Sequence, residues 1–168
     1  YHFSDEEKQE LSVGELDSEV QRTADDFLQV FFRPPDWTNA SSFSLEGHTS
    51  AISSASFSPD GRLIVTSSFD GSARIWVSET GRELIKLEGN PSPLWSAAFS
   101  SDGLMVVTAS LDGTAHIWDV ETGAVIASFH HSKTLYKVNF SPDGRFIISA
   151  SSDGMARIWE IESEREVL

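Results

Sequence analysis

Serine, histidine and aspartate recur together in this sequence in an order that could bring them to one site. The two sets are His48, Ser68 and Asp70, and His131, Ser151 and Asp153. A histidine that is held by an aspartate and bonded to a serine hydroxyl can activate that hydroxyl for acyl transfer. The same residue types can instead form a buried hydrogen-bond network with no chemistry. The elements that carry the two sets decide between these interpretations.

Two short strings recur three times along the chain. The pattern Phe-Ser-x-Asp-Gly begins at residues 57, 99 and 140, and the pattern Asp-Gly-x-Ala-x-Ile-Trp begins at residues 70, 112 and 153. Both strings advance by 42 and then by 41 residues, so the sequence contains a true repeat. A reactive site is not expected once per repeat. The recurrence therefore favours a structural role over a catalytic triad.

Other catalytic patterns are missing from the sequence. It contains no P-loop, dinucleotide-binding glycine motif, zinc-protease motif or serine-hydrolase elbow. The run His-His-Ser-Lys at residues 130–133 could be a metal or acid–base cluster. It lies at the junction of two repeats, which favours a loop and a structural histidine. We therefore expect no catalytic residue, no metal site and no cofactor.

Each repeat is predicted to form four short strands. In the first copy we place them at residues 52–57, 63–68, 73–77 and 83–87. The connector Ser58-Pro59-Asp60-Gly61 has the residues of a tight hairpin turn, and Asp70-Gly71 forms the next turn. The run Leu-Ile-Val-Thr at residues 63–66 is apolar on both faces. Such a strand is typical of a sheet that is stacked between neighbouring sheets.

Repeats of this length that end in Ile-Trp-Asp resemble WD repeats of the β-propeller class. Trp118 and Asp119 form the Trp-Asp pair, and Gly47 and His48 form the Gly-His pair. The resemblance implies an all-β fold with about three four-stranded blades, at residues 45–87, 88–129 and 130–168 of a propeller region at 40–168. Closed propellers have about four to eight blades, so three would leave an incomplete ring. The mutual similarity of the copies resembles prokaryotic WD-repeat arrays.

The resemblance also gives the recurring polar residues a structural role. In WD repeats a histidine, a turn aspartate, a strand hydroxyl and a tryptophan ring N–H form one buried network. Carried over by position, the first set is His48, Ser68, Asp70 and Trp76, and the third is His131, Ser151, Asp153 and Trp159. The second set is Ser110, Asp112 and Trp118, with Asn90 in place of the histidine. We expect all three sets to hold their blades together.

WD repeats bind partners through exposed positions at one end of the blades. These positions lie three and five residues after the histidine and one residue before the turn aspartate. Mapped onto this chain, they predict a partner-binding face of Phe69, Trp95, Leu111, Tyr136, Pro93 and Thr134, with the smaller Ala51, Ser53 and Ser152. Large exposed apolar residues mark interaction sites. The alternative is that Trp95 and Tyr136 lie in the core between blades.

Residues 1–39 form a separate acidic segment. Residues 1–40 carry ten acidic and three basic residues, which is −7 of the formal net charge of −14. Apolar residues from Leu16 to Phe31 fall at helical spacing and Pro34-Pro35 ends the pattern, which predicts one amphipathic helix at about residues 13–32. Such a charge repels phosphate backbones and excludes nucleic acid as a direct partner.

The sequence has no apolar run long enough for a membrane span and no cysteine, so we expect no membrane contact and a cytoplasmic location. We predict a non-catalytic protein-interaction scaffold or sensor module within a larger multidomain protein. It would dock a protein partner or a neighbouring domain. Two alternatives stay open. The chain could be the regulatory tail of an enzyme (an NTPase, protease or kinase), or a blade array that self-associates to complete the ring.

Overall fold

The computed structural model describes residues 44–89 and 92–167, and every regular element in these ranges is a β-strand. The first sheet contains β1 (Ile52–Phe57), β2 (Leu63–Ser68), β3 (Ala73–Val77) and β4 (Glu83–Leu87). The second contains β5 (Leu94–Phe99), β6 (Met105–Ser110), β7 (Thr114–Asp119) and β8 (Val125–His130). The third contains β9 (Leu135–Phe140), β10 (Phe146–Ser151), β11 (Ala156–Glu160) and β12 (Arg165–Glu166).

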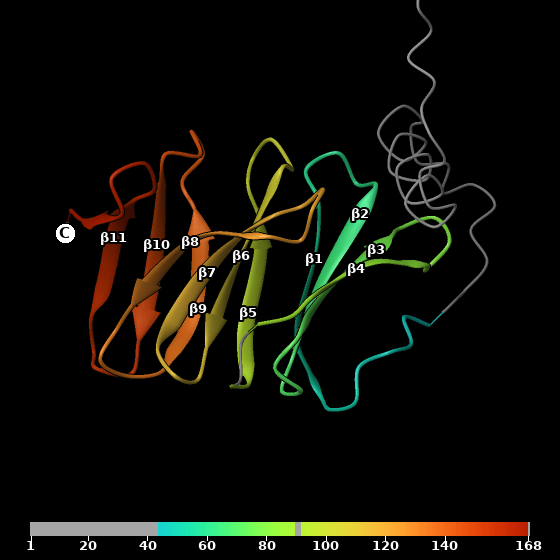
Figure 1. The fold of residues 1–168 in the computed structure, drawn as a ribbon, viewed down its shortest axis with the longest axis horizontal. Coiled ribbons are helices and arrows are strands. Elements are labelled where there is room, and N and C mark those ends of the chain that lie inside the picture. Colours follow the sequence, from blue (N-terminus) through green and yellow to red (C-terminus); the bar gives the residue numbers. More distant parts are fainter. Residues whose placement is uncertain (1–43, 90–91, 168) are drawn as a thin grey trace, which may run out of the picture.

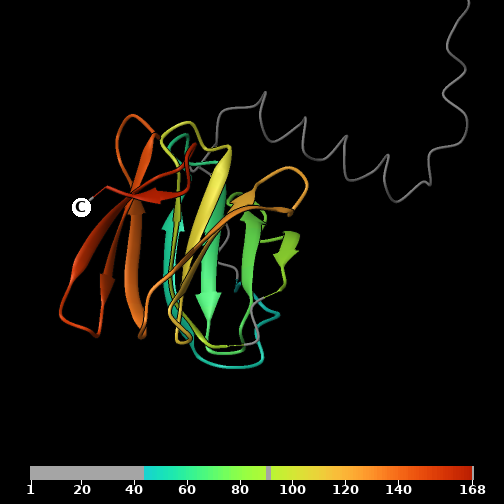
Figure 2. The ribbon, with the colours of Figure 1, turned by 60° about the vertical axis from the view of Figure 1, so that its left-hand side comes forward.

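All three sheets have the same topology, with four antiparallel strands that pair in chain order. They stand side by side, and the first strands β1, β5 and β9 contact one another in sequence (Figure 1). Figure 2 shows the same succession from another side, with the third sheet in orange and red. This repeated arrangement fits three consecutive WD blades.

The connector between the first two strands of each sheet is a tight turn that its own aspartate stabilises. In the first sheet the Asp60 carboxylate accepts hydrogen bonds from the Ser58 hydroxyl at 2.6 Å and from the Arg62 amide at 3.1 Å. Gly61 closes the turn with φ of 75°, a conformation that glycine adopts without a steric penalty. The same bonds recur at Asp102 and Asp143. The hairpin turns expected from the Ser-x-Asp-Gly string are therefore formed.

The two cores lie between neighbouring sheets, so the middle sheet buries both of its faces. We call the side of a sheet that packs on the following sheet its trailing face, and the side that packs on the preceding sheet its leading face. The first sheet's trailing face is Leu63, Val65, Ala73, Ile75 and Leu87. It packs on the second sheet's leading face, which is Leu94, Ala97, Val106, Trp118 and Val120. The second core repeats this pattern between the second and third sheets.

The four strands predicted for the first repeat are confirmed, with the predicted bounds. The helix predicted at about residues 13–32 and the rest of the acidic segment lie outside the described residues, as does Asn90. Within residues 44–89 and 92–167 there is no helix, and so none of a length and hydropathy that would cross a bilayer.

Candidate binding surface and its supporting network

Trp76, Thr66, His48 and Asp70 form one continuous hydrogen-bond network in the first sheet. The Trp76 Nε1–H donates to Thr66 Oγ1 at 2.9 Å, and Thr66 Oγ1 lies 2.8 Å from Nε2 of His48. Nδ1 of His48 lies 2.9 Å from a carboxylate oxygen of Asp70. A carboxylate can only accept, so Nδ1 carries the proton and Nε2 accepts the Thr66 hydroxyl hydrogen. Every polar group in the network is thereby satisfied.

Thr66 supplies the strand hydroxyl of this network, so the expectation that Ser68 would supply it is wrong. The ladder places Ile64 opposite Trp76, so Thr66 is the diagonal neighbour that the indole can reach. Ser68 lies two residues further along and holds the turn instead. Its hydroxyl donates to the Ser50 carbonyl at 3.3 Å and accepts from the Asp70 amide at 3.1 Å.

Asp70 is held as a carboxylate by four donors. One oxygen accepts from the Ser72 amide at 2.9 Å and the Ser72 hydroxyl at 2.7 Å. The other accepts from His48 and, at 3.0 Å, from the Thr49 amide. Burial raises the pKa of this carboxyl, but the hydrogen bonds from Ser72, Thr49 and His48 outweigh it and hold the pKa well below its ordinary range.

The third sheet has the same tryptophan and histidine but a different arrangement around them. Trp159 Nε1–H donates to Ser149 Oγ at 2.9 Å, and Nε2 of His131 lies 2.7 Å from the same oxygen. Ser151 again does not supply this hydroxyl, contrary to expectation, and its own hydroxyl faces the Lys133 carbonyl at 3.5 Å. Here too the strand pairing explains which hydroxyl the indole reaches, because Ile147 lies opposite Trp159 and Ser149 is the diagonal neighbour.

Arg157 lies between His131 and Asp153, which the sequence analysis expected to pair directly. Its guanidinium is 2.6 Å from Nδ1 of His131 and donates to an Asp153 carboxylate oxygen at 2.8 Å. A guanidinium has no acceptor, so Nδ1 of His131 accepts and Nε2 carries the proton. Burial lowers the pKa of His131, and the positive charge of Arg157 lowers it further.

The second sheet keeps the tryptophan bond. Trp118 Nε1–H donates to Thr108 Oγ1 at 2.9 Å, so the hydroxyl is once more two residues before the expected Ser110. The Asp112 carboxylate accepts a hydrogen bond from the Thr114 amide at 2.9 Å, and the Asp112 amide donates to the Ser110 hydroxyl at 3.4 Å. Thr66, Thr108 and Ser149 recur at the repeat spacing, which is the signal that could have identified them.

An exposed row of apolar side chains crosses the end of the sheets where these aspartate turns lie. The Phe69 and Trp95 rings meet edge to face at 4.9 Å, and the Trp95 and Tyr136 rings meet at 5.6 Å. The exposed fractions are 37% for Phe69, 36% for Trp95, 44% for Leu111 and 51% for Tyr136. We call these four residues the apolar row. Trp95 and Tyr136 are thus far more exposed than the core tryptophan Trp118, at 1%.

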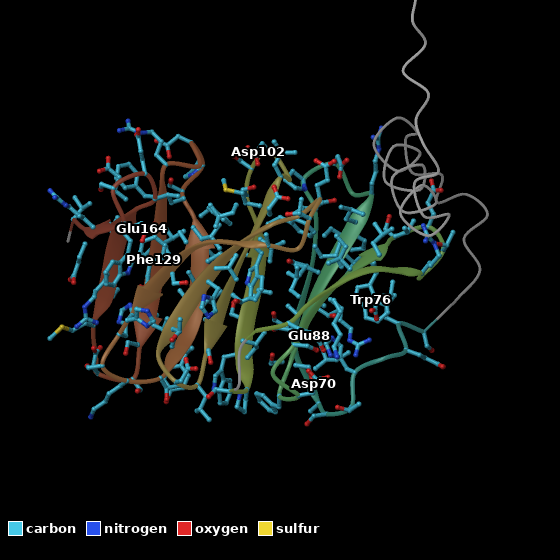
Figure 3. All side chains as sticks on the ribbon, in the orientation of Figure 1. Asp70, Trp76, Glu88, Asp102, Phe129 and Glu164 are labelled. Carbon is cyan, nitrogen blue, oxygen red and sulfur yellow. The ribbon has the colours of Figure 1, made fainter. Side chains whose placement is uncertain are left out.

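Loop backbones hold the apolar row in place. The Leu111 amide donates to the Pro93 carbonyl at 2.9 Å, and the Thr134 hydroxyl donates to the Leu111 carbonyl at 2.9 Å. The predicted residues Pro93 and Thr134 therefore position Leu111 and are only half-buried themselves. Figure 3 places Asp70, the neighbour of Phe69, at the opposite end of the sheets from Asp102.

Both histidines contact hydroxyls that are buried and already bound by a tryptophan ring N–H, an arrangement typical of a structural hydrogen-bond network. Across the two described stretches of the chain, no group of three or more histidine, cysteine, aspartate or glutamate side chains is placed to hold a metal ion. The end of the sheets that carries the apolar row therefore exposes an apolar surface to solvent.

The repeat geometry and the sequence identify the class of protein. Residues 39–77, 81–119 and 123–160 each match the model of the WD domain, G-beta repeat. The chain therefore belongs to the WD40 repeat family, whose members generally act as non-enzymatic interaction scaffolds.

Two curated relatives resemble parts of the chain. "Ribosome biogenesis protein ERB1" of Debaryomyces hansenii is 51% identical over 41 residues, which are 24% of this chain and 5% of that protein. "Ribosome assembly protein 4" of Saccharomyces cerevisiae is 34% identical over 64 residues, which are 38% of this chain and 12% of that protein. The chain thus matches a small part of each relative. Both relatives are eukaryotic, so they give no support to the expected likeness to prokaryotic arrays.

Proposed function

We propose that this chain is a non-catalytic protein-interaction module that docks a protein partner, or a neighbouring domain, on its apolar row. The observation that carries the proposal is the contiguous edge-to-face contact of Phe69, Trp95 and Tyr136 at the solvent-exposed end of three sheets. Aromatic side chains lose little conformational entropy on binding and are enriched at the centres of interfaces. Their mutual packing fixes the positions of these three side chains before a partner binds.

The proposed module works as part of a larger assembly. Both relatives are much longer than the segments that this chain matches, and the names of both concern ribosome formation. The matches cover only 41 and 64 residues, a small part of each relative, so they support the module more strongly than the pathway. Proteins of ribosome assembly are nevertheless the first partner class to test.

The test compares two truncations with a matched control. Partners captured by the wild-type chain are identified, and their dissociation constants are measured for wild type, Trp95→Ala and Tyr136→Ala. We expect each truncation to weaken binding about tenfold or more, as hot-spot residues do. Leu104 is 53% exposed and its amide donates to Asp102, at the other end of the sheets. Leu104→Ala should bind like wild type. Unchanged affinity of folded Trp95→Ala and Tyr136→Ala proteins would disprove the assignment.

A further inference from the structure

The apolar row is a short surface with a serine at each end. In the first sheet Ser53 stands at the position that Trp95 holds in the second sheet, and its hydroxyl donates to the Leu94 carbonyl at 2.7 Å. In the third sheet Ser152 stands at the position of Leu111. The ring centroids within the row are 4.9 and 5.6 Å apart. The row therefore suits a few apolar side chains that are spaced about 5–6 Å apart, as residues three or four apart on a helix are.

Residues 13–32 of the same chain carry apolar side chains with this spacing. The pattern predicts one helix whose apolar stripe is formed by Leu16, Val20, Ala24, Phe27, Leu28 and Phe31. The segment also has five acidic residues and one arginine, so it is negatively charged. A helix of this kind is stabilised in water mainly by the packing of its apolar stripe. We therefore expect the stripe to pack on an apolar surface.

The segment is joined to the sheets at the end that carries the apolar row. Residues 44–51 run along this end towards β1 (Figure 1). There the Phe69 amide donates to the Ala51 carbonyl at 3.0 Å, and the Thr49 amide donates to Asp70 at 3.0 Å. Residues 33–43 span up to about 36 Å when extended, whereas residue 44 and Ala51 lie at most about 25 Å apart. The tether therefore allows the predicted helix to reach Phe69 and the rings beside it.

The charges beside the apolar row suit an acidic segment. Lys133 is exposed and lies next to Thr134, whose hydroxyl donates to the Leu111 carbonyl. No carboxylate of the described residues forms an ion pair with Lys133. The turn aspartates at this end already accept hydrogen bonds within their own sheets, and they are Asp70, Asp112 and Asp153. The Lys133 ammonium is therefore available to the carboxylates of the acidic segment.

We propose that residues 13–32 bind as an amphipathic helix across the apolar row of their own chain, and that a protein partner competes with them for it. The competition rests on the proposed function, whereas the contact within the chain does not. A short tether gives an effective concentration of the order of 1 mM, so a contact with a Kd of about 0.3 mM covers the row in about three-quarters of the molecules. The row stays open in the others, so a partner still binds.

The accessibility of a single thiol in the row tests the contact without any partner. The chain has no cysteine, so Leu111→Cys introduces one thiol whose rate of reaction with a soluble maleimide can be measured. Adding Leu28→Asp and Phe31→Asp disrupts the apolar stripe, and the thiol should then react about fourfold faster. Adding Ser18→Asp and Gln29→Asp instead places the same two charges on the opposite side of the predicted helix and should leave the rate unchanged.

Three further rates separate a specific contact within the chain from other causes. A Leu104→Cys thiol, at the other end of the sheets, should react equally fast with either pair of aspartates. Lys133→Glu should speed the reaction of the Leu111→Cys thiol about twofold by removing an attraction, and Arg145→Glu, on a turn at the other end, should not. The rates should not change between about 1 and about 100 μM protein, because the contact is intramolecular.

Two results from the thiol rates would overturn the proposal. One is an equal rate for the Leu111→Cys thiol with and without Leu28→Asp and Phe31→Asp. The other is a protection that grows with protein concentration, because the row would then be covered by a second copy.

Partner affinity tests the competition separately. A partner that binds the apolar row should bind the Leu28→Asp, Phe31→Asp variant about fourfold more tightly than wild type, because the row is open in every molecule. A partner that is weakened by Trp95→Ala but binds this variant and wild type equally would overturn the competition and leave the proposed function standing. If Trp95→Ala does not weaken the partner, the proposed function fails, and the thiol rates still decide whether the segment covers the row.

Discussion

Arg157 donates a hydrogen bond to Nδ1 of His131 at 2.6 Å, at the position where Nδ1 of His48 instead donates to Asp70. The two histidines occupy equivalent places in the first and third sheets, yet Nδ1 is a hydrogen-bond donor in His48 and an acceptor in His131. The cause is a single cation that enters the third network. This difference gives the third sheet an electrostatic behaviour that can be measured.

Removing the Arg157 cation should raise the pKa of His131. Burial and the Arg157 charge together lower this pKa from its ordinary value of 6.5, and Asp153 opposes them. In Arg157→Gln only burial would still lower the pKa, against the attraction of Asp153 and Glu166, so the pKa should move upwards. NMR titration of the His131 ring signals measures the shift. Arg145→Gln removes a cation that bonds Glu160 instead, and it should leave the His131 titration unchanged.

The folded protein should lose stability as the pH falls through 6.5. His131 and His116 have pKa values lowered from 6.5, in each case chiefly by burial. In the unfolded chain both protonate near 6.5, so just below that pH the unfolded state binds more protons than the folded state. By linkage the free energy of unfolding then decreases as the pH falls. Thermal melts from pH 8 to pH 5.5 should show a falling Tm, and His131→Gln should reduce the slope. A Tm that is flat or rises towards pH 5.5 would contradict this assignment.

Thr66 should matter more for stability than the neighbouring Ser68. Thr66→Val keeps the shape of the side chain but leaves the buried Trp76 N–H without an acceptor, which costs about 1–3 kcal/mol. Ser68→Ala removes longer bonds at a turn and should cost less. Chemical denaturation of the two variants measures both changes. Equal destabilisation, or a larger effect of Ser68→Ala, would favour the network that the repeat motif alone suggests.

The sequence was sufficient to predict the strands of the blades but not the hydrogen bonds inside them. The spacing of the Asp-Gly turns and the apolar strands predicted all four strands of the first repeat. Spacing does not report register across a hairpin, and register is what makes Thr66 rather than Ser68 the partner of Trp76. The sequence also did not predict that the Arg157 side chain lies between His131 and Asp153, because the motif assigns no contact to that position.

The exposed residues were harder to interpret than the strands. Trp95 and Tyr136 stand on inner strands beside core residues such as Leu94 and Leu135, and their side chains could have pointed into either environment. The irregular pairing at the start of β5, between Leu94 and Ser96, accompanies the outward position of Trp95. Such a bulge re-aims a side chain and leaves little trace in the sequence.

Two tryptophans of the second sheet should differ sharply in their effect on stability. Trp118 is 1% exposed and packs in the core between the first and second sheets. Trp118→Ala should destabilise the protein by about 3–5 kcal/mol, as large core truncations do. Trp95 is 36% exposed, and Trp95→Ala should cost much less. Urea denaturation of both variants gives the comparison, and a similar loss in the two would place Trp95 in the core.

The most direct test of the central claim, that this module binds protein through its apolar row, is oxidative footprinting of the chain with a captured partner bound. Trp95 and Tyr136 should become protected on binding, while Met105 and Leu104 near the other end keep their rates of modification. Protection of Leu104 together with unchanged oxidation of Trp95 and Tyr136 would contradict the account.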